Sequence, residues 1–146
     1  MHTPERDLDR MLAGLRPELR SGTYVFARAA APPAGVDPAV TVAEDEGLTV
    51  VCTREEAEAA GLVYDFAAAW ITLRVHSALD AVGLTAAVSA ALARAAIPCN
   101  IVAGFHHDHV FVPADESERA LDVLRTLSAE AAAGGTDDAA VADGCR

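Results

Sequence analysis

Residues 70–113, WITLRVHSALDAVGLTAAVSAALARAAIPCNIVAGFHHDHVFVP, decide the fold. Residues 71–76 alternate apolar with polar side chains, which is the period of a strand with one buried face. Residues 82–96 repeat leucine, valine and alanine at helical spacing, and Pro98 ends this helix. Two further strands, 99–104 and 109–112, flank the polar turn FHHD. The stretch therefore predicts a strand, a helix and two more strands.

A second helix follows, and the combined order indicates the fold class. Asp115 is predicted to cap this helix, in which Leu121, Leu124, Leu127 and Ala131 share one face. The order strand, helix, strand, strand, helix is the ferredoxin-like βαββαβ layout without its last strand. We therefore predict an α+β protein in which helices cover antiparallel sheets.

The missing edge strand must come from the N-terminal half of the chain. Residues 23–28, TYVFAR, are the most strand-like segment there, so we predict that they complete the second sheet and interlock the two halves. The predicted division is an N-terminal half at residues 1–66 and a C-terminal domain at residues 67–132. The small, acidic and unpatterned residues 133–146 predict a disordered tail.

Local signals predict the other elements of the N-terminal half. Residues 5–15 place apolar side chains at helical spacing. Residues 39–53 indicate two strands around an acidic turn, where Gly47 permits a positive φ. Thr53 and Glu56 match the capping box of a short helix. This half therefore contributes a hairpin and two short helices.

The charge of the chain argues against nucleic acid as a partner. The formal net charge is -11, and every cationic side chain is an arginine, since the sequence contains no lysine. No broad basic face exists to neutralise a phosphate backbone. The absence of lysine also excludes a phosphate-loop lysine and a Schiff-base lysine.

The cysteines and the apolar segments point to a reduced, cytoplasmic protein. Cys52, Cys99 and Cys145 are odd in number and lack CxxC spacing, and the N-terminal MHTPERDLDR is charged where a secretory signal would be apolar. No apolar stretch approaches the roughly 20 residues that span a bilayer, so no membrane partner is expected. Cys52 and Cys99 lie on predicted strands and are expected to pack as small apolar residues.

The histidine-rich turn raises the question of a metal site. In a strand, His107 and His109 face one side while His106 and Asp108 face the other, so the four do not converge on one ion unless the backbone turns sharply. Cys99 and His76 are the obvious further ligands. A polar hairpin tip is more often solvated or bonded to its own backbone, so we expect no metal and no cofactor.

Catalysis is not indicated by the spacing of the reactive side chains. Ser77 and Cys99 are possible nucleophiles, but neither has a strained-elbow or triad spacing. A histidine is useful to an enzyme only beside a nucleophile or a substrate. No catalytic residue is therefore predicted.

Four segments carry a family resemblance. VHSALDAVGLTAAVSAAL (75–92), IPCNIVAGFHHDHVFVP (97–113), GTYVFA (22–27) and EDEGLTVV (44–51) together resemble the small bacterial ACT-domain proteins, in which two ACT-like halves share one chain. The resemblance spans roughly residues 8 to 128. The family commonly has a second serine where this chain has Ala78.

The resemblance implies regulation and not catalysis. ACT domains typically bind an amino acid at an interface between ACT modules, and the tandem ACT regions of aspartate kinases are related to this arrangement. The chain carries no kinase or other catalytic domain. A free-standing module of this kind is expected to act as a sensor.

The residues around the predicted strand-to-helix turn suit an amino-acid ligand. Backbone N–H groups at the start of the helix would bind a carboxylate, and Asp108 would receive an ammonium group by a charge-assisted hydrogen bond. Alternatively, Gly83 merely eases entry into the helix and Asn100 pairs with local backbone. The candidate ligand-binding residues are Ser77, Val82, Gly83, Leu84, Thr85, Asn100, Ile101, His107 and Asp108.

Two other hypotheses belong to different functional classes. In the first, the chain is an interaction protein that only dimerises. In the second, it is a small metal-dependent hydrolase that uses the histidine cluster. A homodimer is expected under the leading hypothesis as well, because small ferredoxin-like domains expose sheet edges and helix faces that pairing covers.

Overall fold

The computed structural model describes residues 3–142, with side chains described as far as Gly134. One seven-stranded sheet runs through the molecule in the order β3-β4-β2-β5-β7-β6, with β1 beside β5. The elements are α1 (Leu8–Ala13), β1 (Pro17–Leu19), β2 (Tyr24–Ala29), β3 (Val40–Glu44), β4 (Gly47–Thr53), α2 (Arg54–Ala59), β5 (Val63–Leu73), α3 (Leu84–Arg94), β6 (Asn100–Ala103), β7 (Asp108–Pro113), the short 3-10 helix η1 (Ala114–Glu116) and α4 (Ser117–Ala142).

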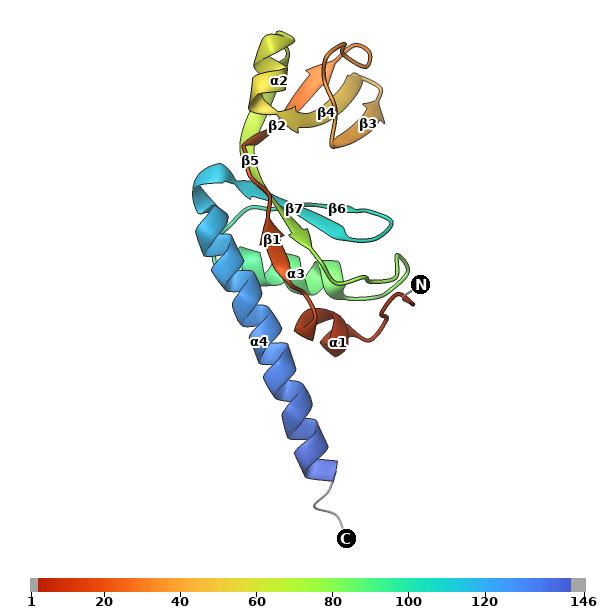
Figure 1. Ribbon diagram of the computed structural model, residues 1–146, viewed down its shortest axis with the longest axis vertical. Helices are drawn as coiled ribbons and strands as arrows, with labels where there is room; N and C mark the ends of the chain where they lie inside the picture. The colour runs from red at the N-terminus through yellow and green to blue at the C-terminus, as the bar shows by residue number, and fades with distance from the viewer. Residues whose placement is uncertain (1–2, 143–146) are drawn as a thin grey trace.

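The strand β5 joins two lobes (Figure 1). Its first part pairs with β2 in the lobe that contains β3, β4 and α2, and its second part pairs with β1 and β7. The backbone bends at Phe66, whose φ is 56°, opposite an irregularity in β2. The predicted boundary between residues 66 and 67 therefore falls within one continuous strand.

The edge strand of the C-terminal lobe is β1, and the prediction that residues 23–28 complete this sheet is wrong. The order β1-β5-β7-β6 is the ferredoxin-like order, in which β1 takes the place of the missing last strand. Pro17 pairs with Leu73, whereas β2 is occupied by β4 and by the first part of β5. The two halves still interlock, because β1 comes from the N-terminal sequence.

Three helices cover one face of the C-terminal sheet. Ile71 and Leu73 of β5 and Val110 of β7 point to this face and are at most 1% exposed. They pack against Val88 of α3 and Leu124 of α4, with α1 closing the layer. The opposite face carries Trp70 and Phe111, which are 7% and 0% exposed and pack in a second apolar cluster.

The N-terminal lobe follows its local sequence signals. The hairpin of β3 and β4 turns at Gly47, whose φ is 142°. Thr53 accepts a hydrogen bond from the backbone N–H of Glu56, and the Glu56 carboxylate accepts one from the backbone N–H of Thr53, so the predicted capping box is present. The helix α2 packs on a small core that includes Cys52, which is 1% exposed.

The last helix, α4, differs from the sequence prediction at both ends. It starts at Ser117, because η1 contains Asp115, so Asp115 is not its cap. It continues to Ala142, through most of the segment predicted to be disordered, and residues 143–146 lie outside the described part of the chain. The alanine-rich sequence after residue 128 favours this extension. No helix within residues 3–142 is both long enough and apolar enough to cross a membrane.

Candidate functional site

A small pocket lies where β5 leads into α3. Its volume is about 80 Å³, well below the roughly 300 to 1,000 Å³ of pockets for drug-sized ligands. The connecting segment between β5 and α3, residues 74–83, is called the site loop below. It forms one wall of the pocket, and the β6–β7 hairpin forms another. The lining residues are Ser77, Ala78, Leu79, Ala81, Gly83, Leu84, Thr85, Ala103 and Asp108.

The N-terminus of α3 supplies unpaired backbone donors to this pocket. Gly83 is the N-cap with a φ of 105°, and no side chain within the described residues caps the helix. The first helical hydrogen bond runs from the N–H of Ala87 to the carbonyl of Gly83, at 2.9 Å. The N–H groups of Leu84 and Thr85 precede this bond and therefore lack a helical acceptor. The first turn contains no acidic residue, so no side chain of this turn neutralises the positive end of the helix dipole.

Asp108 is the charged group of the pocket. It lies at the start of β7, between Leu73 of β5 and Ala103 of β6, and is only 8% exposed. Within residues 3–134, its carboxylate forms no hydrogen bond and no ion pair. Burial raises the pKa of Asp108, and the neighbouring His107 opposes this shift. An almost buried, unpartnered carboxylate is costly unless a cation meets it.

The structure brings together five of the nine residues expected to bind a ligand. Ser77, Gly83, Leu84, Thr85 and Asp108 all line the pocket. The other four lie outside its lining. These are Val82, Asn100, Ile101 and His107.

Each of these four residues has a clear position. Val82 is 84% exposed on the outside of the site loop. Asn100 pairs with Phe111, at the far end of the hairpin from Asp108 and on the other sheet face, and Ile101 is packed against the core below the helices. His107 lies at the hairpin tip, where its carbonyl accepts a hydrogen bond from Gly104.

The histidines that the structure describes divide into two groups. The ring of His106 lies 5.6 Å from that of His76 and 6.2 Å from that of His107, centroid to centroid. His109 lies on the opposite sheet face from Asp108 and accepts a hydrogen bond from Trp70. In the part of the chain that the structure describes, no three His, Cys, Asp or Glu side chains are placed to hold a metal ion.

Cys99 does not approach the pocket. It is half-buried and packs against the core under the helices. Burial raises the pKa of its thiol, which disfavours the nucleophilic thiolate. Ser77, the other possible nucleophile, lines the pocket, and none of the described histidines lines the pocket with it.

Sequence reasoning missed the contribution of the N-terminal segment to the site. Leu8, the first residue of α1, packs under Gly83, where an added Cβ would lie 3.0 Å from Leu8 Cδ2. The sequence gives no signal for this contact, because it depends on how α1 folds back beside the site loop.

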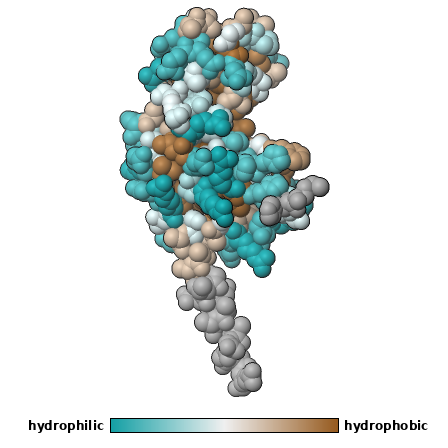
Figure 2. Space-filling view, viewed as in Figure 1, coloured by the Kyte–Doolittle hydropathy of each residue, from teal (hydrophilic) through white to brown (hydrophobic). Residues whose placement is uncertain are grey.

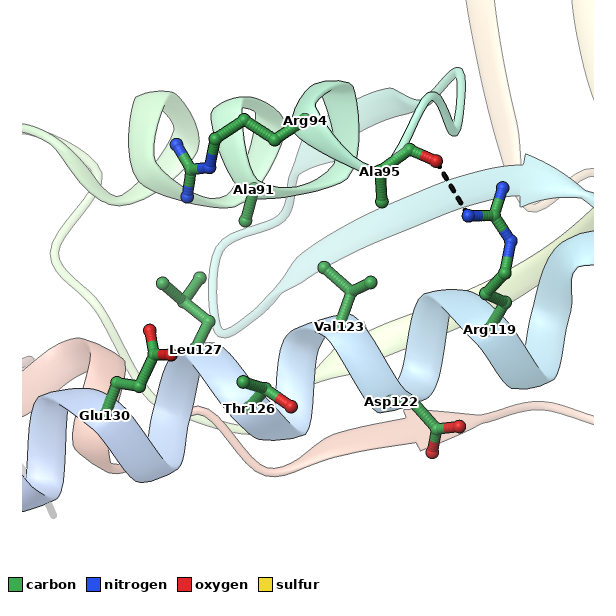
Figure 3. A pocket seen from close by; sticks show the side chains of 9 residues that line it. All are labelled: Ala91, Arg94, Ala95, Arg119, Asp122, Val123, Thr126, Leu127 and Glu130. Atoms are coloured by element: carbon green, nitrogen blue, oxygen red, sulfur yellow. Dashed lines mark hydrogen bonds between the residues drawn. The ribbon is translucent and has the colours of Figure 1, made fainter.

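A second hollow lies between α3 and α4 and has a volume of about 450 Å³ (Figure 3). Its floor is apolar, with Ala91 and Val123 facing each other. Arg119 is already engaged, since it donates to the carbonyl of Ala95 at 2.7 Å and pairs with Glu116. Asp122 points away from α3. The hollow between α3 and α4 therefore lacks the convergent, buried polar groups of a small-molecule site.

Figure 2 shows polar residues over most of one face, with apolar residues in small, separate areas. The most exposed large apolar side chains near the pocket are Leu79, Val82 and Phe105, at 65%, 84% and 76%. They flank the pocket on the site loop and on the hairpin tip.

Comparisons with known proteins agree with this architecture. Two family models, both described as an ACT domain, match the chain at residues 3–69 and 66–126. A crystal structure from Vibrio cholerae, described as a protein of unknown function and possible transport protein, is 40% identical and has a TM-score of 0.75. The match covers 83% of this chain and 95% of that one.

Two more distant structures share the fold. A protein from Agrobacterium tumefaciens is 23% identical with a TM-score of 0.66, over 77% of this chain and 87% of that one. The ligand-free regulatory subunit of aspartate kinase from Thermus thermophilus is 11% identical with a TM-score of 0.61, over 78% of this chain and 97% of that one. A search of curated proteins found no match.

Proposed function

We propose that this chain, which belongs to the ACT-domain family, is a regulatory module that binds a free amino acid. The observation that carries the proposal is Asp108, a carboxylate that is nine-tenths buried, unpartnered among the described residues and part of the lining of the pocket at the start of α3. A cation is the group that this carboxylate lacks. An anion is the group that the free N–H donors of α3 lack.

An amino acid supplies both charges on one carbon. Its ammonium group would donate to Asp108, and its carboxylate would accept hydrogen bonds from the N–H groups of Leu84 and Thr85. Ser77 adds a hydroxyl at the same wall. Hydrogen bonds to ionised groups contribute about 1.5 to 3 kcal/mol each, so two such anchors are sufficient for specific but modest affinity.

The pocket volume suggests how much of the ligand one chain encloses. About 80 Å³ accommodates the main-chain part of an amino acid, so the side chain would leave past Leu79. The exposed apolar side chains beside the pocket would then meet either that side chain or a second subunit. We propose a homodimer, which light scattering at micromolar concentration tests.

We further propose that this module catalyses no reaction and that it is located in the cytoplasm. Aspartate kinase regulatory subunits, whose fold the chain shares, are non-catalytic modules. Cys52 and Cys99 are unpaired in the described part of the chain, which suits a reducing compartment.

Titration with the twenty proteinogenic amino acids, followed by thermal unfolding, tests the proposal. A ligand at 100 times its Kd stabilises the folded state by about 2.7 kcal/mol. Substitution Asp108→Asn should remove most of this effect, whereas Asp122→Asn, the same change at an exposed position on α4, should leave it intact. If none of the twenty amino acids stabilises the protein, the proposal is contradicted.

The two charges of the ligand are tested separately. The active amino acid is compared with its N-acetyl derivative, which lacks the ammonium group, and with its amide, which lacks the carboxylate. Both should bind more weakly than the zwitterion. If the N-acetyl derivative binds as tightly as the amino acid itself, Asp108 does not bind the ammonium group.

A further inference from the structure

The N-terminal segment, residues 5–8, lies along the site loop. The N–H of Glu5 donates to the carbonyl of His76 at 2.8 Å, and the N–H of Ala78 donates to the carbonyl of Glu5 at 3.0 Å. These bonds form a short parallel bridge between Glu5 and Ser77. Figure 1 shows the N-terminus and α1 beside the loop that leads from β5 to α3.

Two side chains extend this contact along the loop. Arg6 pairs with Asp80 at 2.6 Å, and Leu8 fills the space beneath Gly83. The Arg6–Asp80 pair is largely exposed, with side chains 65% and 74% accessible, so water and salt screen it. The backbone bridge and the packing of Leu8 are therefore the contacts that hold the loop.

The contacted positions are those on which the candidate site depends. Ser77, Ala78 and Gly83 line the pocket, and Gly83 also begins the helix whose N–H groups face it. Gly83 has its left-handed φ of 105° directly above Leu8. In the described part of the chain, Glu5 is the one residue that forms a β-bridge with residues 77–83.

We propose that residues 5–8 position the site loop, so that amino-acid binding and docking of this N-terminal segment stabilise each other. This inference rests on the proposed function for its ligand, and adds an output to it. By linkage, a ligand that prefers the ordered loop must favour the docked segment by the same free energy. The N-terminal segment is thus the part of the surface that changes with ligand occupancy.

The first experiment uses no ligand. Hydrogen exchange of residues 76–85 is measured in the full chain and in Leu8→Ala, with Leu19→Ala as the matched control. Both leucines are partly buried against the same core, but Leu19 lies on β1, away from the loop. Under conditions where all variants are folded, Leu8→Ala should accelerate exchange in the loop by about fivefold or more, and Leu19→Ala should not.

The backbone bridge has its own pair of variants. Glu5→Pro removes the N–H that donates to His76, whereas Glu5→Ala keeps it and removes only the side chain. Glu5→Pro should accelerate exchange in residues 76–85, and Glu5→Ala should change it much less. Unchanged loop exchange in both Leu8→Ala and Glu5→Pro overturns the proposal.

The second experiment adds a mixture of the twenty proteinogenic amino acids to the full chain. Protection of residues 77–86 together with residues 5–8 supports the coupling. Protection of residues 77–86 alone overturns it and leaves the proposed function intact. If the mixture protects neither region, the proposed function and the ligand-linked output fail, and the ligand-free experiment decides whether residues 5–8 position the loop.

Discussion

Trp70 donates a hydrogen bond from its indole Nε1 to Nδ1 of His109, 3.0 Å away, on the sheet face that the helices leave open. Arg20 lies over the same indole, 3.8 Å from the ring centroid. The Nδ1 of His109 must be unprotonated to accept this bond, so the imidazole is neutral. Burial is the main cause that lowers the pKa of His109, and the charges of His107, Arg20 and Arg74 add to it.

This arrangement predicts loss of stability in mild acid. The folded pKa of His109 lies below the ordinary 6.5, so the unfolded chain binds more protons in that window and the free energy of unfolding falls as pH falls through it. The pKa of His107 is lowered too, chiefly by burial, and acts in the same direction. Chemical denaturation between about pH 7 and pH 5 measures the effect.

Two variants separate the two histidines. His109→Gln and His107→Gln should each reduce the slope of stability against pH. Only His109→Gln should abolish the pH dependence of fluorescence from Trp70, the one tryptophan of the chain. An unchanged slope in both variants contradicts this assignment.

Asp108→Asn is predicted to stabilise the ligand-free protein at neutral pH. Burial raises the pKa of Asp108 above its ordinary 3.8, so the folded state binds more protons than the unfolded chain between these values, and stability falls as pH rises through this window. The ionised, unpartnered carboxylate is therefore a cost at pH 7. Its removal should raise the free energy of unfolding by about 1 kcal/mol.

Denaturant titration at several pH values checks this prediction. The gain should disappear below the window, where Asp108 is protonated in both states. Asp122→Asn, on the exposed side of α4, should change stability by no more than about 0.5 kcal/mol. A less stable Asp108→Asn protein at pH 7 would show that the carboxylate has a partner.

Gly104→Ala is predicted to destabilise the β6–β7 hairpin. An added Cβ would lie 2.8 Å from the carbonyl oxygen of His107 and 3.1 Å from Nε2 of His109. Because the nearest atom belongs to the backbone, the turn must shift, at a cost of about 1 to 3 kcal/mol. The Trp70 fluorescence should change as well, since His109 moves.

Gly134→Ala is the matched control for this substitution. Gly134 lies in α4, and a Cβ there meets no atom within 4 Å. Alanine should favour the helix by up to about 1 kcal/mol. In thermal unfolding, Gly104→Ala should lower the melting temperature and Gly134→Ala should raise it. A change in the same direction for both substitutions contradicts the contact at Gly104.

The fold was predictable where local signals and tertiary contacts agree. Thr53 with Glu56 specifies a cap through two neighbouring hydrogen bonds, and Gly47 specifies a turn through its own φ. Ile71 and Leu73 are apolar because they lie on the sheet face that packs against the helices. β1 was missed because three residues, beginning with Pro17, carry no period, and only their pairing with Leu73 makes them a strand.

The site was predictable only in part, for a related reason. Gly83 and Asp108 stand at the ends of elements, and the ferredoxin-like order brings those ends together. Asn100 is separated from them by register: it pairs with Phe111, whose side chain belongs to the other face. The alternation of side chains along β7 indicates which sheet face Phe111 occupies. The pairing of Asn100 with Phe111 depends in addition on the length of the turn between β6 and β7.

Amino-acid binding is predicted to weaken in acid at a higher pH than an ordinary aspartate would require. The ammonium group binds ionised Asp108, and burial raises the pKa of this carboxyl in the ligand-free protein. As pH falls through that raised value, the fraction of protein with an ionised site decreases, and the affinity should fall about tenfold per pH unit below it. His107 acts against this shift in the carboxyl pKa, so His107→Gln should move the onset to a higher pH.

Calorimetric titration of the most stabilising amino acid across this pH range measures the dependence. The stability loss from His109 is a separate effect, so binding is compared at pH values where the protein is folded. In Asp108→Asn, residual binding should be weak and should not change with pH over the same range. A wild-type affinity that stays constant through the acid range would mean that the ammonium group of the ligand does not bind Asp108. If the N-terminus of α3 still binds the ligand's carboxylate, the ammonium group must then bind another residue.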